Sequence, residues 1–200
     1  MIVTDIKQMT PEWHKAKIGK IGGTRFKDVF KANNLDLIDT LIAEIGSQYK
    51  EITYINDAMQ WGIDHEPIAK DLYSKVKGVK IKDMPLCLSE WNDILQLSPD
   101  GFTECLTGGL EVKCPSTKVH CKYIRMDKLP SEYKYQVYDY FLVNEKLEWL
   151  DFVSFDWRFK PMPMWIKRIN RVDIAEELET CKSEYLKFYD KFLKYKNQII

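Results

Sequence analysis

The pattern of apolar and polar residues along the chain predicts alternating helices and strands. Apolar residues three or four positions apart predict three internal helices and one long amphipathic helix, over 35–45, 55–76, 131–143 and 173–197. Short helices are expected after Thr10 and Thr24, whose hydroxyls can cap them. Alternating or compact apolar runs predict strands over 79–88, 94–98, 110–114, 148–155 and 164–169. The order of these elements predicts an α/β (α+β) fold, a sheet with flanking helices.

One apolar stripe of the helix over 55–76 contains an acid. Met59, Ile63, Ala69 and Tyr73 share this stripe with Glu66, at helical spacings of three or four. An unpaired buried carboxylate is costly. Glu66 therefore either pairs with another group inside the protein or faces a functional site, and the sequence leaves both open.

The helix over 131–143 has a similar exception. Gln136 shares a stripe with Tyr133, Val137 and Tyr140. The amide can bond across a helix–sheet interface or reach an active site. The tyrosines of this segment could stack on bases, although packing explains them more simply.

Length and composition are those of one folded domain spanning 1–200. The chain has 200 residues, of which 45% are hydrophobic and 13% aromatic, enough for a packed core. No apolar run approaches the roughly 18 residues of a membrane span. The first five residues show no basic region followed by an apolar stretch, so we expect no secretory signal. Five cysteines without a Cys-x-x-Cys motif fit a reducing compartment, and we expect a cytoplasmic protein without a membrane partner.

The charges of the chain cancel. Thirty basic and thirty acidic residues give a net charge of zero. Proteins that coat nucleic acid widely usually carry a basic excess, so the balance argues against indiscriminate binding. It permits local basic patches, and a protein that encloses DNA can be basic inside and acidic outside.

The most informative motif is Ser98-Pro99-Asp100-Gly101 followed after ten residues by Glu111-Val112-Lys113. Side chains alternate faces on a strand, so Glu111 and Lys113 point the same way. A Pro-Asp-Gly turn can bring Asp100 to that face, across the hairpin-like turn at 107–109. Two crowded carboxylates favour a cation between them, and magnesium prefers oxygen ligands. With a lysine to hold phosphate or to activate water, the pattern predicts metal-assisted phosphodiester cleavage.

Each fragment alone also occurs on solvated turns and strand faces. Within the nucleases, a restriction-type endonuclease uses the same residues but cuts circular DNA, whereas an exonuclease needs an end. A non-catalytic DNA-binding module is the alternative outside enzymes, and it would be expected to lack one acid or the lysine.

Five blocks, in order, carry a resemblance to a known family. They are Trp13–Ile21, Trp61–Glu66, Ser98–Gly101, Leu110–Pro115 and Tyr135–Val137. Together they resemble the PD-(D/E)xK nuclease superfamily and, within it, the lambda exonuclease group, also called YqaJ-type viral recombinases. The resemblance covers roughly 13–171. It implies a mixed central sheet flanked by helices in a single nuclease domain.

The same resemblance implies a 5′-to-3′ exonuclease that degrades one strand of double-stranded DNA from its end during phage recombination. It implies a ring-shaped homotrimer, a single-strand annealing protein as partner, and the host cytoplasm as location. The cofactor it implies is Mg²⁺, two ions, with Mn²⁺ as a substitute.

Site residues follow from the resemblance position by position. The metal ligands fall on Asp100, Glu111, the backbone carbonyl of Val112, and Glu66. Lys113 activates the attacking water.

The remaining implied residues hold the DNA. Gln136 supports the lysine or the scissile phosphate, and Lys17, Thr24 and Ser98 form a pocket for the 5′-phosphate. The family has arginine where Lys17 stands, so a bidentate fork is lost, and serine where Thr24 stands, so a hydroxyl is kept. A hydrophobic wedge that parts the strands falls on Met59, which core packing explains equally well.

Overall fold

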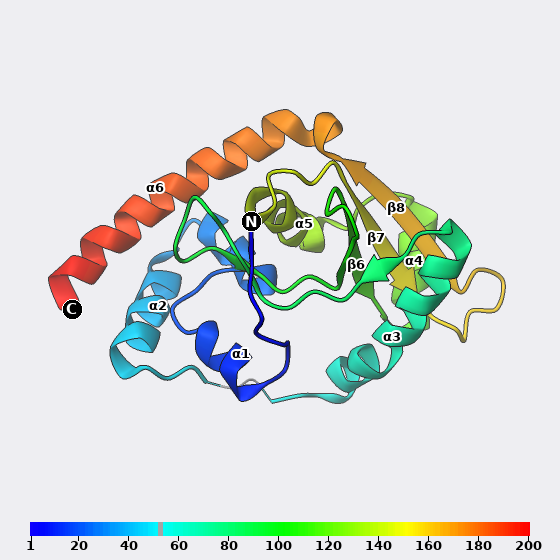
Figure 1. Cartoon of the computed structure of the whole chain (residues 1–200), viewed down its shortest axis with the longest axis horizontal. Helices are drawn as coiled ribbons and strands as arrows, with labels where there is room; N and C mark the ends of the chain where they lie inside the picture. The colour runs from blue at the N-terminus through cyan, green and yellow to red at the C-terminus, as the bar shows by residue number, and fades with distance from the viewer. Residues whose placement is uncertain (52–53) are drawn as a thin grey trace.

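The computed structural model describes residues 1–51 and 54–200 as mixed helix and sheet (Figure 1). The α-helices are α1 (Pro11–Ala16), α2 (Leu35–Ser47), α3 (Asp57–Lys77), α4 (Thr117–Met126), α5 (Lys134–Val143) and α6 (Ala175–Ile199). Three 3₁₀ segments join them: η1 (Gly23–Phe30), η2 (Ser131–Tyr133) and η3 (Arg171–Ile174). None of the helices in the described part of the chain has the length and apolar composition needed to cross a bilayer.

The central sheet has five strands in the order β2-β5-β6-β7-β8. They are β2 (Ile81–Lys82), β5 (Gly101–Thr103), β6 (Gly108–Lys113), β7 (Trp149–Phe155) and β8 (Met164–Asn170). Strands β6 and β7 are parallel, with Glu111 opposite Phe152, and the other neighbours are antiparallel. Helices α4 and α5 lie in the crossover between β6 and β7, as a parallel pair requires. The predicted mixed sheet with flanking helices is confirmed.

The two faces of β6 meet different helices. Leu110 and Val112 pack in a small apolar core with Ala69 and Tyr73 of α3. The opposite face looks toward α5, where Gln136 contacts Glu111. This alternation was predicted for Glu111 and Lys113, and it places the acid and the lysine of β6 between the sheet and α5.

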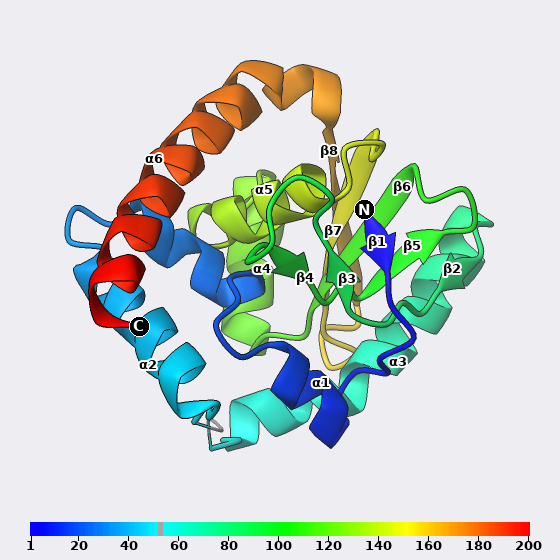
Figure 2. The ribbon, with the colours of Figure 1, turned by 60° about the vertical axis from the view of Figure 1, so that its left-hand side comes forward.

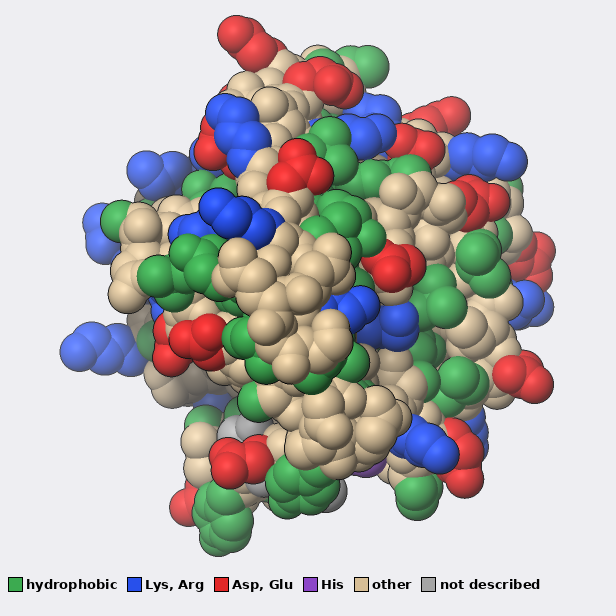
Figure 3. Space-filling view, turned by 90° about the vertical axis from the view of Figure 1, so that its left-hand side faces the viewer, with side chains coloured by type: hydrophobic (Ala, Val, Ile, Leu, Met, Phe, Trp, Pro, Cys, Tyr) green, Lys and Arg blue, Asp and Glu red, His purple; other side chains and the backbone are tan. Residues whose placement is uncertain are grey.

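The main apolar core lies on the α5 side of the sheet. It joins β7 to α5, α2, α6 and η1, with large buried side chains such as Phe26, Phe141, Phe152 and Phe192. Figure 2 shows α6 running along one side of the molecule past α5 to α2. On the face of Figure 3 basic and acidic side chains are interspersed, as the zero net charge suggests.

Two strand predictions are wrong. The segment 79–88 is divided between β2 and β3 (Cys87–Leu88), which belong to different sheets. The intervening Pro85 has no N–H to donate to a ladder. The predicted hairpin of 94–98 with 110–114 does not form, because Pro99 ends the first segment and β5, beyond Asp100, pairs with β6 instead.

The segment 94–98 joins a second, smaller sheet. It contains β4 (Gln96–Leu97), which pairs with β3, and β3 pairs in turn with β1 (Ile2–Val3). The expected turn at 107–109 is also displaced, because Gly108 and Gly109 lie inside β6. A Cβ at Gly108 would lie 2.2 Å from the Trp149 ring, so these glycines serve packing rather than a turn.

The helix predictions fare better. Thr10 caps α1 by accepting from the Trp13 N–H at 3.2 Å. Thr24 does not cap a helix, because it lies inside η1 and Gly22 precedes that segment. Helix α4 was not predicted, since its buried face is short and rests on His120 and Tyr123 amid basic residues. The expected terminal helix corresponds to η3 and α6.

Candidate active site

Asp100 lies where the chain passes from β4 to β5, and its carboxylate binds the backbone of β6 just beyond the residues that pair with β5. Its Oδ2 accepts from the Val112 N–H at 2.7 Å, while its own N–H donates to the Tyr140 hydroxyl at 2.9 Å. Burial raises the pKa of Asp100 well above its usual value, and the nearby charge of Glu111 raises it further. A second positive charge at this place would relieve that repulsion.

Glu111 is almost fully buried, at 1% exposure, and three side chains hold it. Its Oε1 pairs with the Lys113 ammonium and accepts from Gln136 Nε2 at 2.6 Å. Its Oε2 accepts from the Tyr140 hydroxyl at 2.6 Å. Because both oxygens are fixed, the carboxylate has one orientation, toward the side of β6 where Asp100 lies.

Lys113 is the cation of this cluster. Burial alone would lower its pKa, but the attraction of Glu111 and Asp100 outweighs burial and raises the pKa of Lys113 above its usual value. Its ammonium also lies 5.3 Å from the centroid of the Tyr133 ring. In this arrangement Lys113 keeps its proton and is a fixed hydrogen-bond donor, suited to hold a water or an anionic oxygen.

The Val112 backbone completes the set of oxygen ligands. In a strand the N–H and C=O of one residue point to the same neighbouring side. The Val112 N–H donates to Asp100, so its carbonyl also faces the Asp100 side. Two carboxylates and a carbonyl there fit a hard divalent cation such as Mg²⁺.

Glu66 approaches from the other face of the sheet, on α3. It is 35% exposed and pairs with Lys70 at 3.3 Å. Lys70 donates in turn to the Asp100 carbonyl at 2.8 Å and pairs with Asp83 at 2.6 Å. Both alternatives for Glu66 therefore apply, since it has a partner and also lines the cleft. Among the described residues no three His, Cys, Asp or Glu side chains converge on one point. The charge of Glu66 nevertheless reaches Asp100 and helps to raise its pKa.

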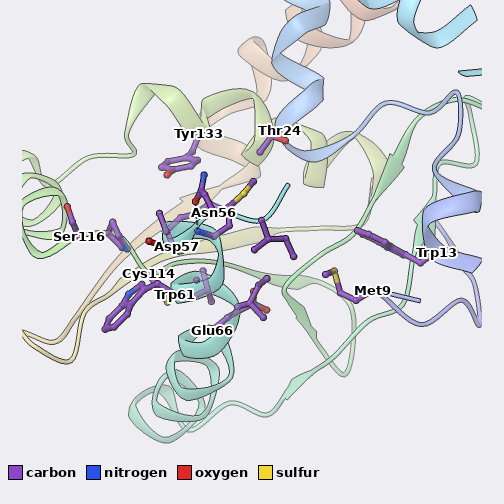
Figure 4. Close-up of a pocket in the computed structure, with 18 of the residues that line it drawn as sticks. Met9, Trp13, Thr24, Asn56, Asp57, Trp61, Glu66, Cys114, Ser116 and Tyr133 are labelled. Carbon is purple, nitrogen blue, oxygen red and sulfur yellow. Dashed lines mark hydrogen bonds between the residues drawn. The ribbon is translucent and has the colours of Figure 1, made fainter. Parts of the chain in front are cut away.

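A cleft with a volume of about 1030 Å³ opens beside Glu66, Val112 and Lys113, whereas Asp100, Glu111 and Gln136 are not among the described residues that line it. Its walls come from α1, α3, the end of β6 and the β7–β8 turn. In Figure 4, Trp13 lies on one side of the hollow and Cys114 and Ser116 on the other, with Glu66 and Tyr133 between them. Ile63 and Met59, 44% and 47% exposed, line the α3 wall. The predicted apolar stripe of α3 is thus buried at Ala69 and Tyr73 and open to the cleft at its start.

The model of the YqaJ-like viral recombinase domain matches residues 12–146, about two thirds of the chain. The chain belongs to this family. The resemblance inferred from the sequence is therefore confirmed. No curated protein sequence matches the chain.

Solved structures agree with the family. The chain is 30% identical to the alkaline exonuclease LHK-Exo from Laribacter hongkongensis, over 94% of this chain and 97% of that chain, with a TM-score of 0.80. A structure of LHK-Exo in complex with dAMP matches equally well. A phage-related exonuclease from Haemophilus somnus shares 13% identity over 97% of each chain, with a TM-score of 0.54, which shows the fold alone.

Lys17 and Thr24 of this YqaJ-like protein both line the cleft. The Lys17 ammonium lies 3.7 Å from the centroid of the Trp13 ring. Burial, helped by the positive charges of Lys50 and Arg25, lowers the pKa of Lys17 to about 8. A partly buried cation close to like charges favours binding of an anion.

Ser98 differs from the other two predicted phosphate-binding residues. Its hydroxyl accepts from Trp13 Nε1 at 3.0 Å, and it is not among the described residues that line the cleft. Ser98 thus contacts the same Trp13 side chain over whose ring the Lys17 ammonium lies. Ser98 therefore supports the tryptophan in this structure.

Sequence reasoning missed Tyr140, whose hydroxyl joins Glu111 to the Asp100 backbone. The signal was present, because Tyr140 follows Gln136 by four residues and so lies on the same face of α5. It also missed Asp139, a buried carboxylate of α5 that accepts from the Gly23 N–H at 2.7 Å. Nothing in the local sequence separates Asp139 from an exposed helical acid.

Proposed function

We propose that the protein is a metal-dependent 5′-to-3′ exonuclease that degrades one strand of linear double-stranded DNA from its end, in phage-type recombination. The observation that supports this most is the cluster of buried Glu111 with partly buried Asp100 and Lys113 on β6 and at its side. Family membership and the likeness to LHK-Exo, described as an alkaline exonuclease, point the same way.

Mg²⁺ is the cofactor of this proposal, two ions, with Mn²⁺ as a substitute. Asp100, Glu111 and the Val112 carbonyl would hold it, and Glu66 would join after turning from Lys70. Bound divalent ions lower the pKa of water and stabilise charge on the attacking and leaving oxygens. The raised pKa of Asp100 supports a cation at this place.

The protein side chains orient the reacting groups. Lys113 holds the attacking water or the scissile phosphate as a hydrogen-bond donor. Gln136 fixes Glu111 through its Nε2, while its Oε1 is buried without a partner among the described residues. That free amide oxygen can accept from a water or from Lys113. Tyr140 keeps Asp100 and Glu111 in register.

The polarity of cleavage rests on the pocket at the Trp13 side. Lys17 and Thr24, with Ser98 supporting Trp13, would bind the terminal 5′-phosphate and place the first linkage over Asp100. The complex of LHK-Exo with dAMP is consistent with a site for a nucleotide. Met59 is the side chain proposed to part the strands, and its exposure in the cleft supports that role.

The proposal includes a homotrimeric ring around the duplex and a single-strand annealing protein as partner. Both rest on the family alone. A DNA endonuclease remains the second candidate, since the same cluster cuts internal linkages when the cleft is open at both ends. A non-catalytic DNA-binding module is disfavoured because both acids and the lysine are in place.

Digestion of a linear and a circular duplex tests the proposal. Linear duplex with one 5′-phosphate and one 5′-hydroxyl strand, and a circular duplex, are incubated with the protein and Mg²⁺. We expect loss of the phosphorylated strand first and an intact circle. Asp100→Asn should be inactive, whereas Asp71→Asn, which removes an exposed acid of α3, should behave as the wild type. Cutting of the circle would favour the endonuclease, and equal activity of Asp100→Asn would refute this active site.

A further inference from the structure

Arg158, in the turn from β7 to β8, is held rigidly at the edge of the cleft. Its Nε and Nη2 donate to Asp156 at 2.7 and 3.1 Å, and its backbone N–H donates to the same carboxylate at 3.0 Å. Asp156 is buried and also accepts from the Thr117 hydroxyl. The guanidinium carbon lies 4.0 Å from the centroid of the Trp61 ring of α3. A side chain fixed by an ion pair and an aromatic face loses little entropy when it binds a ligand.

The contacts of Arg158 leave one edge of the guanidinium free. Asp156 takes the Nε–Nη2 edge, and Nη2 also lies 3.4 Å from the Pro115 carbonyl. Nη1 has no partner among the described residues, and the side chain is 38% exposed and lines the cleft. Two donors on a delocalised cation, aimed into a cleft, suit a phosphate oxygen.

The place of Arg158 along the cleft decides which phosphate it can reach. Pro115 follows Lys113 by two residues, which in an extended chain is about 7 Å. Neighbouring phosphates of one DNA strand are separated by a comparable through-space distance, because the strand winds around the duplex axis and their rise of roughly 3.4 Å along the axis is only part of that distance. Figure 4 shows Trp13, which carries Lys17, on one side of the hollow, and Cys114, next to Pro115, on the other. Arg158, which contacts the Pro115 carbonyl, and Lys17, which lies over the Trp13 ring, are therefore at opposite sides of the cleft.

We propose that Arg158 binds a backbone phosphate of the strand being cut, the one immediately 3′ of the scissile linkage. This inference rests on the proposed function, because it takes the 5′-phosphate to lie at Lys17 and the scissile phosphate at Lys113. Asp156 and Trp61 are positioning residues that aim the free edge of the guanidinium. The strand is then held on both sides of the cut, which keeps the linkage in register with the acids.

Arg158→Lys is the decisive variant. A lysine keeps the ion pair with Asp156, but its single ammonium has no second edge for the cleft. Binding of a 5′-phosphorylated duplex is measured in EDTA, without hydrolysis, over a series of salt concentrations. We expect Kd to rise about tenfold and the slope of log Kd against log salt to fall by roughly 0.9, the loss of one phosphate contact. Lys187→Ala, which removes an exposed lysine of α6 paired with Glu184, should change neither value.

A neutral methylphosphonate linkage locates the contact. Placed second from the 5′ end, it should weaken binding by the wild type and have no further effect on Arg158→Lys. Placed at the tenth linkage, it should affect both proteins alike. In Trp61→Ala the methylphosphonate at the second linkage should weaken binding much less than in the wild type. In Trp61→Phe it should weaken binding as in the wild type, since a ring remains under the guanidinium.

The outcomes separate this inference from the proposed function. Digestion of linear duplex by the wild type, together with an unchanged salt slope in Arg158→Lys, refutes the Arg158 contact alone. The Arg158 contact is also refuted if a methylphosphonate at the second linkage weakens binding equally in the wild type and in Arg158→Lys. A wild type that neither binds nor digests duplex refutes both. Thermal unfolding of each variant confirms that it is folded.

Discussion

Removing the hydroxyl of Tyr140 tests whether this residue holds the two acids together. Tyr140→Phe keeps the ring, which is fully buried and makes an edge contact with Phe102, so no cavity is created. It removes a hydrogen bond of 2.6 Å to Glu111 and leaves the Asp100 N–H, bound at 2.9 Å, without its acceptor. The change is therefore confined to polar contacts of the active site.

The expected cost follows from these two contacts. A hydrogen bond to a charged group contributes about 1.5–3 kcal/mol, and a buried donor left unpaired costs about 1–3 kcal/mol. Asp100 is only partly buried, so water can replace part of the second term. We expect a loss of about 3 kcal/mol in the free energy of unfolding, a large part of the roughly 5–15 kcal/mol of a typical domain.

Urea unfolding of the metal-free protein measures this loss. Tyr185→Phe is the matched control, because Tyr185 is also fully buried and donates one hydrogen bond of 2.6 Å, to the neutral Asn92. It should cost about 1 kcal/mol and leave nuclease activity unchanged. In Tyr140→Phe we also expect turnover to fall by about 10²-fold, since small displacements of catalytic groups have effects of that size. Equal stability of the two variants would refute the role assigned to Tyr140.

Three further predictions follow. Lys17 is cationic only below its pKa of about 8, so the rate ratio of 5′-phosphorylated to 5′-hydroxyl duplex should fall from pH 7 to pH 9, and Lys17→Arg should abolish that fall. In urea unfolding, Gly108→Ala should lower the free energy of unfolding by about 1–3 kcal/mol, because its Cβ would lie 2.2 Å from Trp149. The control Gly62→Ala should raise the free energy of unfolding by roughly 0.5–1 kcal/mol, because a Cβ there meets open space. Mg²⁺ at about ten times its Kd should raise the Tm of the wild type by roughly 3–5 °C in a thermal scan, and leave Asp100→Asn unchanged. The first prediction is contradicted if the rate ratio does not change between pH 7 and pH 9. The second is contradicted if Gly108→Ala leaves the free energy of unfolding unchanged, and the third if Mg²⁺ raises the Tm of Asp100→Asn.

Local signals in the sequence predicted much of the fold. The period of the apolar residues gave α2, α3, α5, α6, β7 and β8 close to their observed bounds, because these elements bury a regular face. Short elements were predicted less well. Strands β2 to β5 have two or three residues each, too few for a period to register. Which of them pair depends on Pro85 and Pro99 and on contacts far along the chain.

The candidate site divides in the same way. The sequence by itself determined that Glu111 and Lys113 share a face, because side chains alternate on a strand, and that Asp100 sits at a turn beside them. Only the tertiary structure decided what surrounds them. Tyr140 and Gln136 reach Glu111 because α5 packs on that face, and Glu66 pairs with Lys70 because both lie on α3, which covers the other face. Arg158 meets Trp61 across nearly a hundred residues. A sequence pattern records the spacing within one element, whereas contacts between elements depend on how their buried faces pack.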